Sequence, residues 1–223
     1  MQTKNIKKYI ISFTFSVTAL LFCLAADAQS SRLTMHRPAR NRITQEQLGR
    51  EVSFLSDSLC GGRATGTRGS AEAAFWVARK FAGTGLMKIN DSWSKRVVTE
   101  NGPPGHNLVG FLPGSAMTHP DSYVIVGAHY DHLGTVNGRF FPGADANASG
   151  VAAMTAVADM LATTRSIGRS FSSNIIFVAF DGKEMNMAGS QSLWDMISAG
   201  ELTDPVNGKK ITKDKIAFMV NID

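Results

Sequence analysis

The sequence predicts an α/β fold, a three-layer sandwich in which helices cover both faces of a central, mostly parallel sheet. Two patterns support this expectation. Short apolar runs alternate with segments of helical periodicity, and three of the runs end directly in polar residues. These runs are Tyr123–Ala128, Ile175–Phe180 and Ile216–Ile222. Continuous apolar runs of this length are typical of strands that are buried on both faces.

Two helices are expected before the first of these runs. Thr44 and Gln47 have the spacing of a capping box, and helical spacing follows at Leu48, Val52, Leu55 and Leu59. A glycine-rich stretch over residues 60–69 is expected to turn the chain. The second helix, ending near Gly83 and Gly85, is indicated by Ala71, Ala74, Phe75, Ala78, Phe81 and Ala82.

The remaining elements follow in order. Strands are expected at Lys95–Thr99 and Asn107–Leu112, separated by a turn at Asn101–Pro104. A helix after Asn147 is predicted by Val151, Met154, Ala158 and Leu161, with Ser149 well placed near its N-terminus. Another is predicted by Ser190, Leu193, Trp194 and Ile197.

The amino-terminal segment has the features of a secretory signal peptide. Lys4, Lys7 and Lys8 precede an apolar segment, and an A-x-A cleavage site follows at residues 26–28. We therefore expect a signal peptide over residues 1–28, a flexible lead-in over 29–43 and one domain over 44–223. The mature protein is expected to be exported, to the periplasm or outside the cell, without a stable membrane anchor. It would retain a single cysteine, Cys60, and so no internal disulfide.

The formal charge of +5 is small, scattered and partly due to the leader, so nucleic acid is not an expected partner.

Candidate metal ligands follow the three strand-like runs. His129 comes first, with Asp131 two residues later, and Glu184 and Asp223 follow the other two runs. Ligands of open α/β sheets bind just outside the carboxyl ends of the strands, so these side chains should share one crevice. Imidazole with carboxylates indicates zinc. Asp145 either ligates the metal or caps the helix that begins near Ser149.

The motifs resemble those of a known family. They are Ala128–Gly134 (AHYDHLG), Gly143–Gly150 (GADANASG), Lys183-Glu184 and the closing Asp223. The chain thereby resembles the co-catalytic zinc aminopeptidases of metallopeptidase family twenty-eight, whose relatives include aminopeptidase Y, glutamate carboxypeptidase and glutaminyl cyclase. The resemblance implies a zinc-exopeptidase-like fold, two zinc ions, and removal of amino-terminal residues from peptides. It also implies that His129, Glu184 and Asp223 are zinc ligands and that Asp131 orients His129.

The sequence departs from the family pattern at three places. The family's G-A-D-D-N-A-S-G motif has a bridging aspartate where this chain has Ala146, and Lys183 stands at the position of the general base. A last histidine ligand would lie beyond Asp223, so the domain is expected to be incomplete at its C-terminus.

Relative to the family pattern, Ala146 removes one negative charge and Lys183 adds two positive units, a sum that is close to the charge of one divalent ion. The Lys183 ammonium can therefore replace one zinc ion, and one zinc or none is expected. The alternative to an aminopeptidase is thus a catalytically impaired relative that binds peptide. A lesser alternative is a glutaminyl-cyclase-like acyl transferase.

Overall fold

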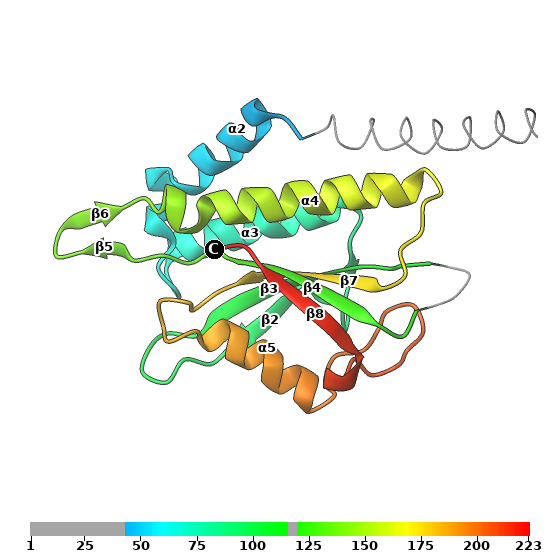
Figure 1. The fold of residues 1–223 in the computed structure, drawn as a ribbon. Helices are drawn as coiled ribbons and strands as arrows, with labels where there is room; N and C mark the ends of the chain where they lie inside the picture. The colour runs from blue at the N-terminus through cyan, green and yellow to red at the C-terminus, as the bar shows by residue number, and fades with distance from the viewer. Residues whose placement is uncertain (1–42, 116–119) are drawn as a thin grey trace, which may run out of the picture. The chain divides into compact units, whose positions relative to one another are not determined.

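A computed structural model describes residues 43–115 and 120–223 (Figure 1). Residues 43–223 form one compact unit. The predicted signal peptide and most of the lead-in lie outside the described residues, so their prediction stays untested. Within the described part, no helix combines the length and the apolar character needed to cross a membrane.

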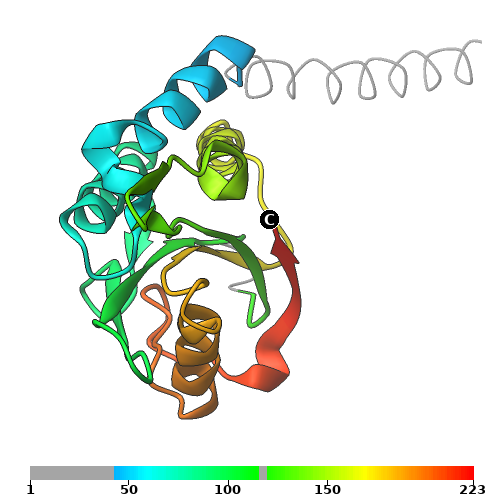
Figure 2. The same cartoon turned by 90° about the vertical axis from the view of Figure 1, so that its left-hand side faces the viewer.

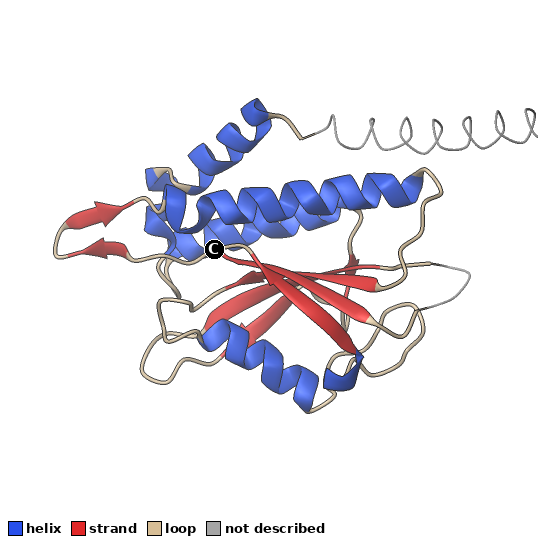
Figure 3. Cartoon of the chain, in the orientation of Figure 1, coloured by secondary structure: helices blue, strands red, loops and turns tan. Residues whose placement is uncertain are grey.

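The centre of the fold is a mixed sheet, whose strands are red in Figure 3. Its strand order is β1-β3-β7-β4-β8, and β2 also pairs with β3. The strands are Met87–Lys88 (β1), Ser94–Val97 (β2), Gly105–Leu112 (β3), Tyr123–His129 (β4), Asn174–Phe180 (β7) and Ile216–Asn221 (β8). β4 is parallel to both β7 and β8, whereas β3 is antiparallel to β1, β2 and β7. Among the described strands of this sheet only β3 therefore runs against the others, which confirms the mostly parallel sheet.

Helices cover both faces of this sheet, as Figure 2 shows from the side. Arg68–Thr84 (α3) and Ser149–Ser166 (α4) lie on one face and Ala188–Ser198 (α5) on the other, while Gln45–Leu55 (α2) packs against α4. One apolar cluster joins α3 and α4 to the sheet through residues such as Val77, Met154 and Phe177. The other joins α5 to the opposite face through Leu193, Ile197 and Val178. The predicted three-layer sandwich is confirmed.

Shorter elements connect these layers. A 3-10 segment, Ser58–Arg63 (η1), joins α2 to α3, and a second one, Lys213–Lys215 (η3), precedes β8. A small hairpin of Gly134–Val136 (β5) and Arg139–Phe141 (β6) projects after β4 (Figure 1). It leads into a single π turn, Ala144–Ala148 (η2), which runs directly into α4.

Three local predictions need correction. The buried face of α3 carries Ala73, Val77 and Phe81, whereas Phe75 is 63 % exposed, because only the tertiary packing selects between two adjacent helical faces. Thr44 does cap α2, but the Gln47 side chain donates to Glu51 and leaves the capping box half formed. Finally, Ser149 is the first residue of α4, as expected, but its hydroxyl donates to the Asp145 carbonyl, and an asparagine, described below, caps the helix.

Candidate metal site

The parallel strands bring the predicted residues to one edge of the sheet. In the register of β4 with β7, His129 lies beside Phe180, so Asp181 and the loop to α5 follow at the same level. In the register of β4 with β8, Gly127 lies beside Asn221, and the amide of Ile222 donates to the Gly127 carbonyl at 2.8 Å. His129 and Asp223, which are 94 positions apart, consequently meet.

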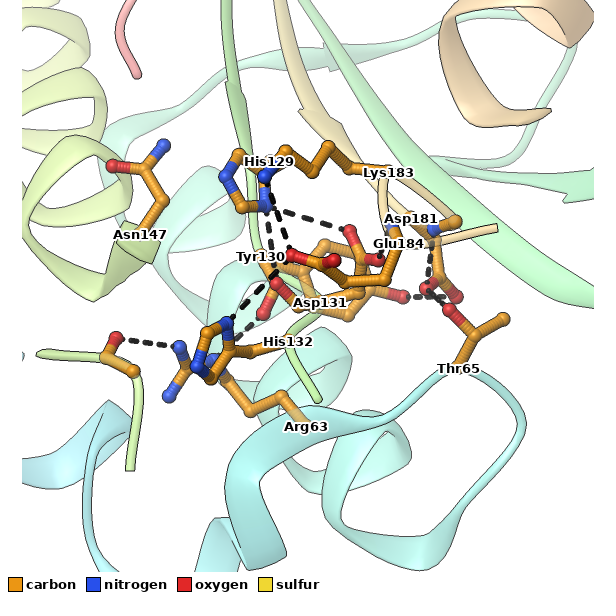
Figure 4. A network of polar contacts seen from close by, with 12 residues as sticks. Arg63, Thr65, His129, Tyr130, Asp131, His132, Asn147, Asp181, Lys183 and Glu184 are labelled. Carbon is orange, nitrogen blue, oxygen red and sulfur yellow. Dashed lines mark hydrogen bonds and ion pairs between the residues drawn. The ribbon is translucent and has the colours of Figure 1, made fainter. Parts of the chain in front are cut away.

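His129 is held from both ring nitrogens (Figure 4). Its Nδ1 lies 3.0 Å from the backbone carbonyl oxygen of Asp131, and its Nε2 lies 3.1 Å from Oδ1 of Asp223. Burial works to lower the pKa of His129, but the hydrogen bonds and charge of Asp131, together with the charge of Asp223, outweigh it and raise the pKa. The surroundings therefore fix the orientation of the ring and aim Nε2 at a carboxylate.

Asp131 is fully buried and links two parts of the site. Its Oδ2 accepts from the backbone amide of Glu184 at 3.0 Å, which ties the end of β4 to the loop after β7. Its Oδ1 lies 3.6 Å from Nδ1 of His129 and has no hydrogen-bond partner among the described residues. Asp131 thus holds His129 by its carbonyl oxygen and places its carboxylate beside the same ring nitrogen.

Glu184 belongs to a second group of side chains. Its Oε1 lies 3.2 Å from Nζ of Lys183 and 3.8 Å from Nδ1 of His132. Burial and the nearby positive charge of Arg63 lower the pKa of His132. Nowhere in residues 43–115 and 120–223 do three His, Cys, Asp or Glu side chains lie close enough together to hold a metal ion. The structure joins His129 to Asp223 and leaves Glu184 with Lys183.

The η2 turn contributes an amide rather than a carboxylate. Nδ2 of Asn147 donates to the carbonyl of Ile222 at 2.7 Å, and its Oδ1 accepts from the amide of Gly150 at 3.0 Å. Asn147 therefore caps α4 and fixes the chain just before Asp223. Ala146 precedes it, and Asp145 is exposed. Two roles were left open for Asp145, metal binding and capping of α4. The residue that caps α4 is Asn147.

Sequence reasoning missed Arg63, which is fully buried. Its guanidinium donates to the carbonyl oxygens of Tyr130, Pro142 and Gly143 at 2.7–2.8 Å and to that of Leu55. It thereby joins the loop after β4 to the loop before η2. The signal available in the sequence was an arginine inside a glycine-rich stretch. A guanidinium has several N–H donors, so a buried one needs several carbonyl acceptors, and a glycine-rich loop can form the compact turn that places it among them.

A second missed group surrounds Asp181. Its carboxylate accepts from Thr65 Oγ1 at 2.8 Å, from the hydroxyl of Tyr130 at 3.0 Å, and from the amides of His106 and Gly182. Burial raises the pKa of Asp181, and burial together with this carboxyl group raises that of Tyr130. Because the Asp181 carboxylate accepts these hydrogen bonds from several segments of the protein, it supports the loop that carries Lys183 and Glu184.

A cavity of about 190 Å³ opens beside His129 and Asp223. Its walls are partly apolar, with Phe180, Met187 and Met219, and partly polar. The complete lining is His129, Phe180, Asp181, Lys183, Met187, Ser190, Met219, Asn221 and Asp223. The cavity therefore offers a carboxylate, an ammonium and an apolar wall to one small ligand group.

Comparison with known proteins finds similarity over the part of the chain that carries these residues. The model of the family described as "Peptidase family M28" matches residues 107–223, which include β4, β7, β8 and every candidate ligand. Aminopeptidase YwaD of Bacillus subtilis (strain 168) is 34 % identical over 96 residues, which are 43 % of this chain and 19 % of YwaD.

Solved structures show the same fold at low sequence identity. The LapA aminopeptidase of Legionella pneumophila is similar with a TM-score of 0.61 and 18 % identity, over 83 % of this chain and 44 % of LapA. The glutaminyl cyclase of Macrostomum lignano is similar with a TM-score of 0.60 and 19 % identity, over 85 % of this chain and 55 % of the cyclase. The chain thus spans about half the length of these solved relatives and about a fifth of YwaD.

Proposed function

This chain belongs to peptidase family M28, and we propose that it is an exported zinc-dependent protein of aminopeptidase type. In this proposal it binds peptides by their amino-terminal end, holds one zinc ion, and hydrolyses peptides weakly or not at all. The observation that carries the proposal is the 3.1 Å approach of His129 Nε2 to Asp223 Oδ1. Family membership supports the reaction type, and the departures at two positions support the impairment.

The two donor atoms would supply two of the three protein ligands of a catalytic zinc site, and within the described residues no third His, Cys, Asp or Glu side chain joins them. With bonds of about 2.0–2.1 Å, two ligands of a tetrahedral zinc lie about 3.4 Å apart. The 3.1 Å between His129 Nε2 and Asp223 Oδ1 is close to this spacing. The Asp131 carbonyl at the other ring nitrogen leaves Nε2 to ligate, as in many zinc sites. A second zinc has a poorer fit, because Ala146 offers no bridging carboxylate and Lys183 contacts Glu184.

The residues around the cavity suit a peptide amino terminus. Zinc bound here would supply Lewis-acid chemistry toward a peptide carbonyl. With Oδ1 of the half-exposed Asp223 assigned to the metal, the second oxygen of this carboxylate would attract the α-ammonium group, while Phe180, Met187 and Met219 form an apolar wall for the first side chain.

In this proposal the site lacks the general base that peptide hydrolysis needs. General-base assistance contributes about 10²–10⁴-fold to such reactions. The side chain at the family's base position is Lys183, which donates to Glu184 at 3.2 Å and so acts as a hydrogen-bond donor. We therefore expect the bound peptide to persist at this site.

Metal analysis and kinetics test the proposal together. The purified protein, dialysed against zinc, should retain about one zinc per chain, which is lost in His129→Ala and kept in the control His106→Ala. Hydrolysis of a leucyl anilide should lie about 10²–10⁴-fold below ordinary enzyme rates. Two tightly held zinc ions with ordinary rates, abolished by chelation and by His129→Ala, would contradict the impairment.

Two bound zinc ions with ordinary rates would favour the second candidate, a fully active aminopeptidase. The similarity to the aminopeptidase YwaD supports this candidate. A glutaminyl-cyclase-like transferase remains the lesser candidate. The cyclase similarity at 19 % identity concerns the fold alone, and Lys183 replaces the acid that such an enzyme would need.

A further inference from the structure

A second and larger cavity lies between α3 and the strands β2 and β3. Its volume is about 460 Å³, and it has only one lining residue in common with the cavity beside His129, namely Asp181. The wall on the side of α3 is apolar and consists of Ala71, Ala74, Phe75 and Ala78. Cavities of this size, with apolar walls and a few polar groups, are typical of small-molecule sites.

The inner end of this cavity is polar and buried. Tyr130 and Asp181 line it, and each is only 1 % exposed. The Tyr130 hydroxyl lies 3.0 Å from Oδ2 of Asp181 (Figure 4) and 2.9 Å from the carbonyl oxygen of His106, which also lines the cavity. A phenol has one proton to donate, so it cannot satisfy both acceptors at once. One of these two oxygens therefore keeps a lone pair for a donor that comes from a ligand.

Asp181 is also a buried carboxylate without a cation beside it. Its other hydrogen-bond donors are the Thr65 hydroxyl and the amides of His106 and Gly182, all of which are neutral. In the ranges 43–115 and 120–223, no lysine or arginine forms an ion pair with Asp181. A buried charge is costly unless an opposite charge accompanies it, so this end of the cavity favours a cation.

An anion fits the same cavity poorly. The described residues that line it include no lysine or arginine, and their one carboxylate is that of Asp181. The first turn of α3 also borders the cavity, but its Ser70 amide already donates to Thr67 Oγ1 at 3.2 Å. The imidazole of His106 is exposed, and its Nδ1 lies 3.0 Å from Ser94 Oγ. Among these residues no fixed positive charge is in place to hold an anion against Asp181.

We propose that this cavity binds a small organic ammonium ion, whose N–H groups donate to Asp181 and to the His106 carbonyl and whose apolar body lies along α3. The ammonium group supplies both the positive charge and the hydrogen-bond donor that the inner end needs. The alanines and Phe75 of α3 provide the apolar contact. Since neither His129 nor Asp223 lines this cavity, the site is separate from that of the proposed function.

Titration calorimetry of the full chain with three ligands of similar size tests the charge. They are phenethylammonium, phenethyl alcohol and phenylacetate. Phenethylammonium should bind at least about tenfold more tightly than the alcohol, because hydrogen bonds to charged groups are stronger than neutral ones, and phenylacetate should bind most weakly. Equal Kd values for the ammonium and the alcohol would overturn the proposal, since Asp181 would then carry its own proton. Absence of phenethylammonium binding would overturn it as well.

Two tryptophan variants of α3 test the location. Ala71→Trp places a large side chain at an exposed position of the cavity wall and should weaken the binding of phenethylammonium by at least about tenfold. The matched control, Ala82→Trp, makes the same change at an exposed position of the same helix outside the cavity, and its Kd should equal that of the wild type. Equal Kd values in the two variants would exclude this cavity as the binding site.

Two further variants separate this cavity from the candidate metal site. Asp223→Asn should bind phenethylammonium as the wild type does, whereas Asp181→Asn should remove the preference for the ammonium over the alcohol. If circular dichroism shows that Asp181→Asn does not fold, the three ligands on the wild type still decide the charge. Weaker binding in Asp223→Asn with unchanged binding in Ala71→Trp would refute this proposal, and would instead support the peptide amino-terminal site of the proposed function.

Discussion

Replacing the buried guanidinium of Arg63 should destabilise the domain and loosen the site. Methionine in Arg63→Met retains most of the aliphatic stem but leaves the carbonyls of Leu55, Tyr130, Pro142 and Gly143 without their donor. Hydrogen bonds to charged groups contribute about 1.5–3 kcal/mol each, so four give a gross loss of about 6–12 kcal/mol. Relief of the desolvation of a fully buried charge offsets several kcal/mol of this.

The net expectation is a loss of about 3–5 kcal/mol in the free energy of unfolding, a large part of the stability of a typical domain. Urea denaturation followed by circular dichroism measures it. The matched control is Arg68→Met, because the Arg68 side chain is 88 % exposed and lies 3.7 Å from Glu72. The control should change the stability by less than about 0.5 kcal/mol.

A loss below about 1 kcal/mol for Arg63→Met would refute the reasoning, since it would mean that water or neighbours satisfy the four carbonyls equally well. Hydrogen exchange gives a local readout. The amide of His132 donates to the Arg63 carbonyl at 3.2 Å, and it should exchange faster in Arg63→Met than in Arg68→Met.

Three further predictions concern the site and the leader. Zinc affinity should fall as the pH drops through the raised pKa of His129, because the protonated ring cannot ligate a metal. Without metal, the protonated ring stabilises the folded state. This contribution to the free energy of unfolding should be lost as the pH rises through the same pKa, which lies above about 6.5. A pH-independent zinc Kd between pH 5 and 8 would count against His129 as a ligand. Ala146→Asp and Lys183→Glu should act non-additively on zinc binding, as expected of neighbours in one site, and additive effects would separate them. N-terminal sequencing of exported protein should find Gln29 or a near neighbour, and retention of Met1 would refute the signal peptide.

The sequence alone determined the layered fold and the edge at which the site lies. Strands buried on both faces must be continuously apolar, so Tyr123–His129 and Asn174–Phe180 were readable from their residues with almost correct bounds. Since parallel strands end at the same edge, the meeting of His129 and Asp223 also followed from the order of the elements.

Only the tertiary structure decided which side chains pair within that edge. Whether Glu184 turns toward His129 or toward Lys183 depends on the loop after β7, which Asp131 holds by the amide of Glu184. The role of Arg63 was equally hidden, because its partners Tyr130 and Gly143 lie 67 and 80 positions away. Periodicity reports the burial of a residue among its neighbours in sequence, whereas hydrogen bonds between loops depend on how distant segments pack.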